Sequence, residues 1–207
     1  MNTRWGRVVV LLWAVVSVGG VTPDCALATT VRVANLQDLV EQAERIFVGK
    51  CVAEERGRIK TIPYAAYTFQ VLDPVKGISS KTVTIKQFGV TQPLPVGNGK
   101  ALIAHIPGMP RYQPGQAYVL FVVRESAIGL SSPAGLGQGA FLVHGTQEHK
   151  KVVNGVNNQN VTRGLSASWL RAKGLTESEV SRLTQFQNGP LDYPFFLQVI
   201  KKISQAP

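Results

Sequence analysis

Residues 117–123, Ala-Tyr-Val-Leu-Phe-Val-Val, are apolar throughout. A strand without a polar face must be covered on both sides, so this segment predicts a central strand of a sheet. Toward the N-terminus, residues 67–71 alternate Tyr, Phe and Val with Thr and Gln, which is typical of a half-buried strand. Val83 and Ile85 alternate with Thr and Lys in residues 82–86. The middle of the chain is therefore predicted to form a β-sheet.

Outward from this centre, the pattern predicts short strands, long loops and a few helices. Further strands are predicted over residues 46–53, 101–106, 140–144 and 151–154. Gly, Pro and charged residues predict loops over residues 54–60, 88–100, 107–116 and 130–139. Helices are predicted over residues 36–45 after the cap Asn35, over 177–187 after the capping box of Thr176 and Glu179, and over 194–204.

The predicted strands follow one another without crossover helices, which favours antiparallel pairing. Short apolar strands suit a closed sheet better than an open one, because closure removes exposed edges. The expected fold is mainly β, a small closed antiparallel, OB-like barrel with a short N-terminal helix and two C-terminal helices. The expected domains are a signal peptide over 1–28, a β-barrel domain over 29–165 and a helical C-terminal appendage over 166–207.

The first 28 residues have the features of an export signal. Arg4 and Arg7 precede the apolar run 8–16, and Ala26-Leu27-Ala28 is a small-x-small cleavage site. The apolar run is too short to span a bilayer comfortably, so no stable membrane span is expected after cleavage. Cleavage after Ala28 leaves 179 residues (207 − 28), enough for one domain with a core. We expect a bacterial protein that is periplasmic or secreted.

Cys25 lies in the expected signal, which leaves Cys51 as the one cysteine of the mature chain. No internal disulfide is then expected. Two alternatives stay open for Cys25, as a lipoprotein acceptor or, in an uncut chain, as a partner of Cys51. The Thr-Pro-Asp that precedes Cys25 does not match the usual lipoprotein pattern.

The chain is basic, with 22 Lys and Arg against 12 Asp and Glu and a net charge of +10. A basic exported domain attracts anionic polymers or acidic proteins, although the charge can also serve solubility alone. A nucleotide is not an expected ligand. The glycine-rich residues 135–139 run into a predicted strand instead of a helix, and no GK[ST] motif occurs.

Residues 43–52, Ala-Glu-Arg-Ile-Phe-Val-Gly-Lys-Cys-Val, are followed by the tyrosine-containing strand 67–71 and by Val75-Lys76-Gly77. Together with residues 112–121, this succession resembles the OB-type barrel of tissue inhibitors of metalloproteinases and netrin-like modules. The resemblance covers residues 43–123. Residues 131–139 are also similar to a segment of uncharacterised exported bacterial proteins.

The resemblance implies a barrel fold and, for the inhibitors, a mature N-terminal cysteine that chelates the zinc of a protease. The predicted first residue here is Thr29, and the disulfides of that family are absent from this chain. The fold is therefore expected to transfer without the inhibitory mechanism, because function depends on sites rather than folds.

No catalytic constellation is convincing in this sequence, and no cofactor is expected. Cys51 could act as a nucleophile with His105 or His144 as base, but its mid-strand position favours a buried structural thiol. His144, His149 and Glu148 flank a predicted turn and are weak candidates for a metal site, although their spacing matches no standard motif.

The loops offer better candidates for contact with a partner. Met109, Arg111 and Tyr112 are residue types favoured at protein interfaces, and an alternative places Tyr112 against the barrel. Gly135, Gly137 and Gln138 belong to a glycine-rich loop at the expected barrel rim. The leading hypothesis is an exported, non-catalytic binding module that contacts a protein, a protease among them, or an anionic envelope polymer through its loops. The alternatives are a hydrolase that uses a histidine-based metal site or Cys51, and a passive envelope component.

Overall fold

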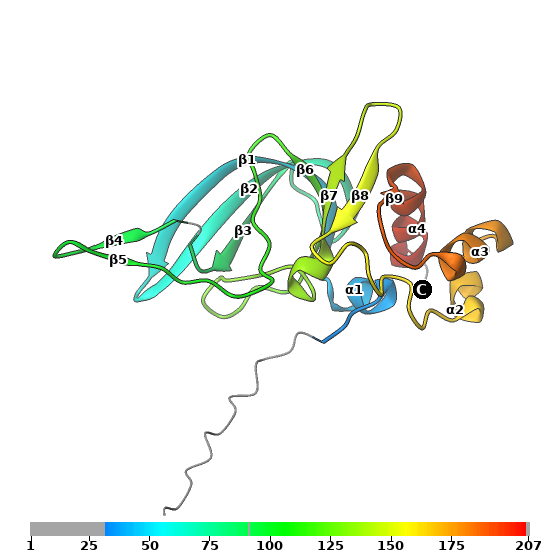
Figure 1. The fold of residues 1–207 in the computed structure, drawn as a ribbon, viewed down its shortest axis with the longest axis horizontal. Helices are drawn as coiled ribbons and strands as arrows, with labels where there is room; N and C mark the ends of the chain where they lie inside the picture. The colour runs from blue at the N-terminus through cyan, green and yellow to red at the C-terminus, as the bar shows by residue number, and fades with distance from the viewer. Residues whose placement is uncertain (1–31, 91, 206–207) are drawn as a thin grey trace, which may run out of the picture. The chain divides into compact units, whose positions relative to one another are not determined.

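The computed structural model describes residues 32–90 and 92–205. These residues contain the following helices and strands in chain order: α1 (Leu36–Gln42), β1 (Arg45–Ile59), β2 (Ile62–Lys76), β3 (Thr82–Phe88), β4 (Leu94–Gly97), β5 (Lys100–Leu102), β6 (Ala117–Val122), the 3-10 helix η1 (Leu136–Gly139), β7 (Ala140–His144), β8 (Lys151–Asn154), α2 (Ala167–Ala172), α3 (Glu177–Gln185), β9 (Leu191–Asp192) and α4 (Tyr193–Gln205). Figure 1 shows the long strands β1 and β2 arching over one part of the molecule and the C-terminal helices gathered near β8 and β9.

Seven strands form one antiparallel sheet in the order β3-β2-β1-β6-β7-β8-β9. Within the described residues, β4 and β5 pair only with each other, as a separate hairpin. The mainly β, antiparallel character and the small number of helices are therefore confirmed. The predicted central strand is β6, which lies between β1 and β7.

Alternate residues of the central strands enter two different cores. On one face, Val119 and Phe121 pack with the helices, and on the other Leu120 and Val122 pack with β2 and β3. All four side chains are fully buried. This explains why the strand has no polar position, since each face of the sheet is covered at β6.

The helical core is built around aromatic rings from three elements. The Phe196 ring of α4 lies 4.7 Å from the Phe141 ring of β7 and 6.4 Å from the Phe121 ring of β6. The buried Leu36 and Leu39 of α1 belong to the same core. Helices α1 and α4 therefore cover one face of the sheet, and the described residues form one compact unit.

The second core is an aromatic cluster inside the curve of β1, β2 and β6. The Tyr112 ring meets those of Tyr67, Phe69 and Tyr118 edge to face, at centroid distances of 4.9, 5.1 and 5.0 Å. Edge-to-face contacts of this kind stabilise a core beyond simple burial, by about 1 kcal/mol each. Because Tyr112 comes from a loop, the cluster ties that loop to the strands.

Gly49 shows how β1 curves. The partners of β1 on β2 shift between Val48 and Gly49, which marks a bulge. A Cβ atom on Gly49 would lie 2.7 Å from the ring of Phe47, so only glycine leaves room for this aromatic side chain. Gly49 therefore combines a bulge with close packing against Phe47.

The sheet is not closed within the described residues, because β3 and β9 remain its two edges. A closed barrel is therefore not confirmed. A loop, rather than a strand, lies beside β3, where the Ser131 N–H donates to the Lys86 carbonyl over 2.8 Å. Pro107 and Pro110 interrupt the loop that follows β5, and a residue without an N–H cannot donate to a β-ladder.

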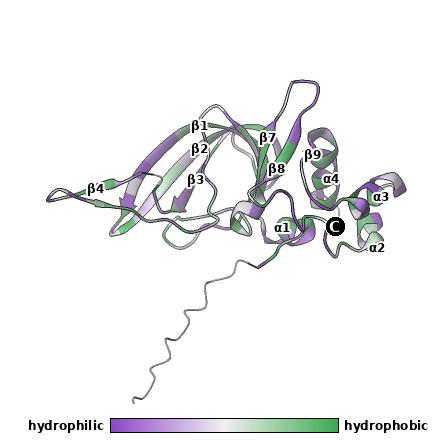
Figure 2. Cartoon of the chain, viewed as in Figure 1, coloured by the Kyte–Doolittle hydropathy of each residue, from purple (hydrophilic) through white to green (hydrophobic). Residues whose placement is uncertain are grey.

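Three local predictions differ from the structure. Residues 54–60, expected as a loop, continue β1 nearly to the turn before β2, and residues 88–100 contain the hairpin strand β4. The expected strand 101–106 is shortened to β5, which ends at Leu102. Helix α2 and strand β9 were not predicted. Figure 2 shows hydrophilic residues along the outer part of β1, where the periodicity of a buried face is missing.

The expected signal peptide over 1–28 and Cys25 lie outside the described residues. Among the helices that the structure describes, none is long and apolar enough to cross a membrane.

Candidate ligand-binding groove

Two Pro-Gly turns shape the segment between β5 and β6. The Met109 N–H donates to the Ile106 carbonyl over 3.0 Å around Pro107-Gly108, and the Gln116 N–H donates to the Gln113 carbonyl over 3.1 Å around Pro114-Gly115. Both glycines have positive φ, 80° and 92°. Proline followed by a positive-φ glycine is the sequence of a type II turn. The segment 109–113 is thus held between two fixed turns.

This segment is also bonded to the core on both sides. The Cys51 N–H donates to the Gln116 carbonyl and the Gly115 N–H donates to the Cys51 carbonyl, each over 2.8 Å. At the other end, the Gly137 N–H donates to the Gly108 carbonyl over 2.8 Å. Two of the loops predicted to contact a partner, 107–116 and 130–139, are therefore in direct contact with each other.

A groove of about 510 Å³ lies between segment 110–116 and the strands β6, β7 and β8. Its base is one row of directly paired residues, Tyr118, Leu142 and Val153. We call this cavity the binding groove; it is lined by Pro110, Arg111, Tyr112, Gln113, Gln116, Tyr118, Ala140, Leu142, His144, Val153, Asn154 and Gly155. Its volume falls within the range of about 300 to 1,000 Å³ that small-ligand sites occupy.

The polar side chains that line the binding groove are one arginine, one histidine, two tyrosines and three amides. Arg111 is exposed and forms no ion pair with any described residue. The His144 Nε2 and Tyr112 hydroxyl atoms are buried without a hydrogen-bond partner in the described part of the chain. No Asp or Glu is among the residues that line the groove. The groove therefore offers a cation without a competing carboxylate.

Tyr112 is 2% exposed, and its hydroxyl is nevertheless unpaired. Burial raises the pKa of Tyr112 well above its usual value, and the nearby Tyr67 and Tyr118 raise it further. The Gln87 side chain opposes this shift, but its geometry with the phenol does not make a hydrogen bond. The Tyr112 hydroxyl is thus neutral at physiological pH and enclosed beside Gln87.

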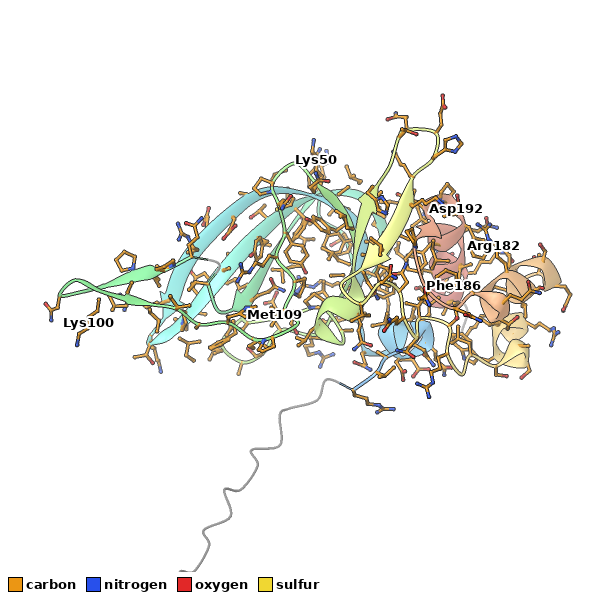
Figure 3. All side chains as sticks on the ribbon, viewed as in Figure 1. Lys50, Lys100, Met109, Arg182, Phe186 and Asp192 are labelled. Atoms are coloured by element: carbon orange, nitrogen blue, oxygen red, sulfur yellow. The ribbon has the colours of Figure 1, made fainter. Side chains whose placement is uncertain are left out.

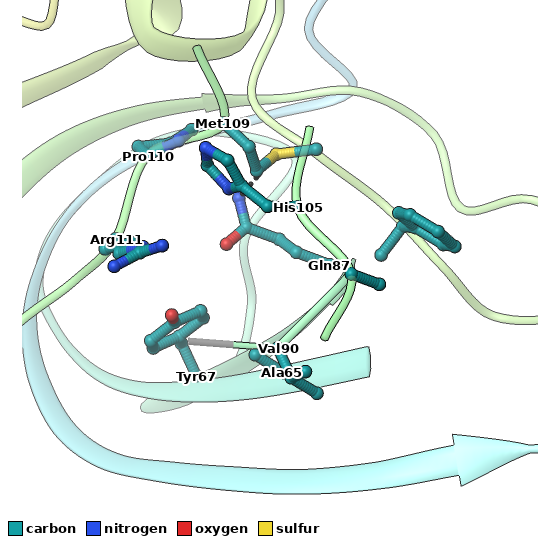
Figure 4. A pocket seen from close by; sticks show the side chains of 10 residues that line it. Ala65, Tyr67, Gln87, Val90, His105, Met109, Pro110 and Arg111 are labelled. Carbon is teal, nitrogen blue, oxygen red and sulfur yellow. Dashed lines mark hydrogen bonds between the residues drawn. The ribbon is translucent and has the colours of Figure 1, made fainter. Parts of the chain in front are cut away.

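A second, smaller cavity of about 20 Å³ lies beside the groove, between β2, β3 and segment 105–111. Figure 4 shows His105, Arg111 and the Gln87 amide turned toward this space. The Gln87 Nε2 donates to the Met109 sulfur over 3.3 Å, while its buried Oε1 has no partner among the described residues. The cavity has the size of one water molecule, so it is too small for an organic ligand.

The three candidates of the first loop have different environments. Arg111 is exposed, Met109 is half-buried against Gln87, and Tyr112 lies in the aromatic cluster. Figure 3 places Met109 within the body of the molecule, in contrast to Lys100 at the tip of the β4–β5 hairpin. Of the three, Arg111 is the side chain that can meet a partner directly.

The glycine-rich loop has a largely structural role. The Gln138 side chain is buried, accepts from the Ala34 N–H over 2.9 Å and donates to the Arg32 carbonyl over 3.0 Å. Gly135 has φ of 59° and begins η1. Gly137 lies between Gly108 and Gly155, where its N–H and carbonyl are both bonded. This loop supports the binding groove rather than lining it.

The histidine candidates separate in the structure. His144 lines the binding groove, whereas His149 and Glu148 are exposed in the β7–β8 loop. No group of three or more His, Cys, Asp or Glu side chains within residues 32–90 and 92–205 could hold a metal ion. His105 lines the smaller cavity beside β3.

Cys51 is fully buried on the inner face of β1. Burial raises the pKa of its thiol, and the nearby Glu54 raises it further, against a weak hydrogen bond to the Ala53 carbonyl. A nucleophilic cysteine needs the opposite shift and access to substrate. The environment of Cys51 is that of a structural core residue.

The sequence analysis missed Gln113, Gln116, Leu142 and Val153 as residues of the groove. The two Pro-Gly pairs at 107–108 and 114–115 were a usable signal, because they predict a segment held between fixed turns. Leu142 and Val153 gave no signal of their own, since their exposure depends on the sheet remaining open.

Comparisons with protein-family models, curated proteins and solved structures give no match to this chain.

Proposed function

We propose that this protein is an exported, non-catalytic binding module that contacts an acidic partner protein through the binding groove and the loops around it. The observation that carries this proposal is the groove itself. It combines an apolar base and an unpaired exposed arginine in one cavity. A cavity with an apolar base and a few placed polar groups is the usual form of a ligand site.

The charge distribution supports an acidic partner. Residues 46–160, which include the sheet and its loops up to β8, carry 12 Lys and Arg against 5 Asp and Glu, a net charge of +7. Complementary charge increases the rate of association and favours acidic over basic partners. An anionic envelope polymer is the second ligand class that this charge would attract.

An OB-like barrel remains part of the proposal. The strand order β3-β2-β1-β6-β7, with a long bent β1, supports a five-stranded, partly open barrel. In this barrel, loops rather than strands lie along the open edge. The relationship to tissue inhibitors of metalloproteinases and netrin-like modules is proposed on the same basis. The export signal and a periplasmic or secreted location complete the proposal, and N-terminal sequencing of the exported protein tests both.

A hydrolase is the alternative from a different class. It would need a reactive Cys51 or a histidine-based metal site, and no observation on the described residues favours either.

The test is retention of a partner from the envelope fraction of the source organism on the immobilised exported protein. We expect a protein retained at low salt, released at raised salt, and lost with Arg111→Gln combined with Gln113→Ala. The matched control is Lys81→Gln, which removes an exposed charge from the β2–β3 connection, away from the groove. Equal retention by both variants, or no retention at low salt, would contradict the proposal.

A further inference from the structure

We propose that the binding groove recognises a carboxylate side chain within an extended peptide segment of the partner. Arg111 and His144 contact this carboxylate. Leu142 and Val153, at the base of the groove, contact an apolar side chain of the same peptide. This inference rests on the proposed function and names the chemistry of its ligand.

The polar contacts come from two separate elements that face the same cavity. Arg111 lies on the segment between the two Pro-Gly turns and borders both the smaller cavity and the groove, and His144 ends β7 on the face that also carries Ala140 and Leu142. A guanidinium is a planar donor that fits a carboxylate with two parallel hydrogen bonds. The His144 imidazole also lines the cavity, with its Nε2 atom buried.

The groove also selects against a cation. No carboxylate lines it, and Glu148, the acidic residue of the adjoining β7–β8 loop, is exposed and not among the lining residues. A lysine or arginine of a partner would therefore meet Arg111 without a compensating charge. Like charges placed together in an interface are strongly unfavourable, so the groove discriminates by charge.

The environment of the two tyrosines favours a peptide over a sugar polymer. Tyr112 and Tyr118 are only 2% and 7% exposed, so neither presents a ring face on which a sugar could stack. Leu142 and Val153 are half-buried, directly paired neighbours, and they provide an apolar base instead. A peptide with an acidic and an apolar side chain matches both parts of the groove.

The probe is a set of acetylated, amidated pentapeptide mixtures with four randomised positions and a central Asp, Asn or Lys. Each mixture is incubated with the immobilised exported protein, and the bound peptides are quantified by mass spectrometry. We expect the Asp mixture to be enriched about tenfold over the Asn mixture, because a charge-assisted pair is lost with Asn. We expect the Lys mixture to be depleted.

Two variants locate the contact. Arg111→Gln should remove the preference for Asp over Asn, whereas Arg56→Gln, at an exposed arginine outside the groove, should retain it. His144→Asn should reduce the preference, while His149→Asn in the exposed loop should not. Thermal unfolding of each variant verifies that it is folded, which is expected for Arg111 because its side chain makes no ion pair in the described structure.

Each other outcome counts against the inference. Equal capture of Asp and Asn mixtures, capture of no mixture, or equal losses in Arg111→Gln and Arg56→Gln would overturn it. Stronger binding of polygalacturonate, with displacement of the captured peptides, would assign the groove to a polymer. If the envelope experiment retains a protein that is lost with the double variant Arg111→Gln, Gln113→Ala but not with Arg111→Gln alone, the proposed function stands and only the carboxylate inference fails.

Discussion

The backbone amide of Gly137 donates to the carbonyl of Gly108, and the 2.8 Å bond joins two loops that follow different strands. The same Gly137 carbonyl accepts from the Gly155 N–H over 2.9 Å. Three backbone segments thus meet at one position without a side chain between them. This junction determines where the segment bearing Arg111 lies relative to β7 and β8, and so determines the width of the binding groove.

Gly137→Ala is expected to loosen this junction. A Cβ at this position would lie 3.0 Å from the Gly108 carbonyl oxygen, a backbone atom that can move only with its turn. We expect a loss of about 1–2 kcal/mol in unfolding free energy and weaker peptide capture. Urea unfolding and hydrogen exchange of the Gly137 amide measure these effects. In Gly155→Ala, the nearest contact of the new Cβ would be 3.3 Å, to the Gly137 backbone, so the loss of stability should be smaller. A larger loss in Gly155→Ala than in Gly137→Ala would contradict this packing.

Tyr112 and Tyr118 form a matched pair for hydroxyl removal. Tyr112→Phe removes an unpaired buried hydroxyl, so the unfolding free energy should stay the same or rise by up to about 1 kcal/mol. Tyr118→Phe removes the acceptor of the Gln113 N–H, 3.0 Å away, and should cost about 1 kcal/mol. Urea unfolding at neutral pH compares the two variants. A larger loss in Tyr112→Phe would show that its hydroxyl has a partner in solution.

Cys51 is expected to be unreactive in the folded protein. Its side chain is fully buried and burial raises its pKa, so both access and thiolate formation are suppressed at pH 7. We expect alkylation by iodoacetamide to be at least about 100-fold slower than in urea, with opening of the fold as the limiting step. Fast alkylation of the folded protein would show that the Cys51 thiol is accessible and reactive, and would support a role as a nucleophile.

Glu179 is expected to make stability dependent on acid pH. Burial opposes its ionisation, but the Lys202 ammonium, 2.8 Å away, and the Thr176 N–H and hydroxyl outweigh burial and lower the pKa of the carboxyl. A depressed folded pKa stabilises the fold above the usual value of 4.5, and this contribution disappears as pH falls through the folded pKa.

Glu179→Gln should therefore lower the unfolding free energy at pH 7 by about 2 kcal/mol, with a smaller difference from the unsubstituted protein at pH 3. Urea unfolding at both values measures the change. Glu177→Gln is the control, because Glu177 pairs with Arg171 at the exposed surface and should matter little at either pH. If Glu179→Gln lowered the unfolding free energy equally at pH 3 and pH 7, ionisation of the Glu179 carboxyl would not be the source of the lost stability.

The central sheet was predictable because its strands follow simple periodicity. Residues 117–123 have no polar position, and β6 is buried on both faces as that pattern requires. The capping boxes at Asn35 and Thr176 likewise mark real helix starts, and Asn35 had been expected as a cap from its side chain alone. Local chemistry determines these features, so a single sequence reveals them.

Other features depend on contacts between distant segments. The charged residues 54–60 extend β1 because they pair with β2, including Arg56 opposite Ala65, beyond the part of the sheet that has two cores. Arg182 of α3 lies 3.9 Å over the Phe195 ring of α4 and 4.0 Å from Asp192 of β9. Figure 3 labels Arg182 and Asp192. The groove combines β7, β8 and a loop, so no local pattern could locate it.

The β4–β5 hairpin offers a practical opportunity for protein engineering. Its strands bond only to each other within the described residues, and the Val90 N–H donates to the Ala104 carbonyl over 2.9 Å where its two ends meet. Ile103 is 70% exposed, so little of the interior depends on this excursion. Replacing the excursion by a fluorescent reporter or an epitope tag would leave the cores intact and give a soluble sensor for whatever the groove captures.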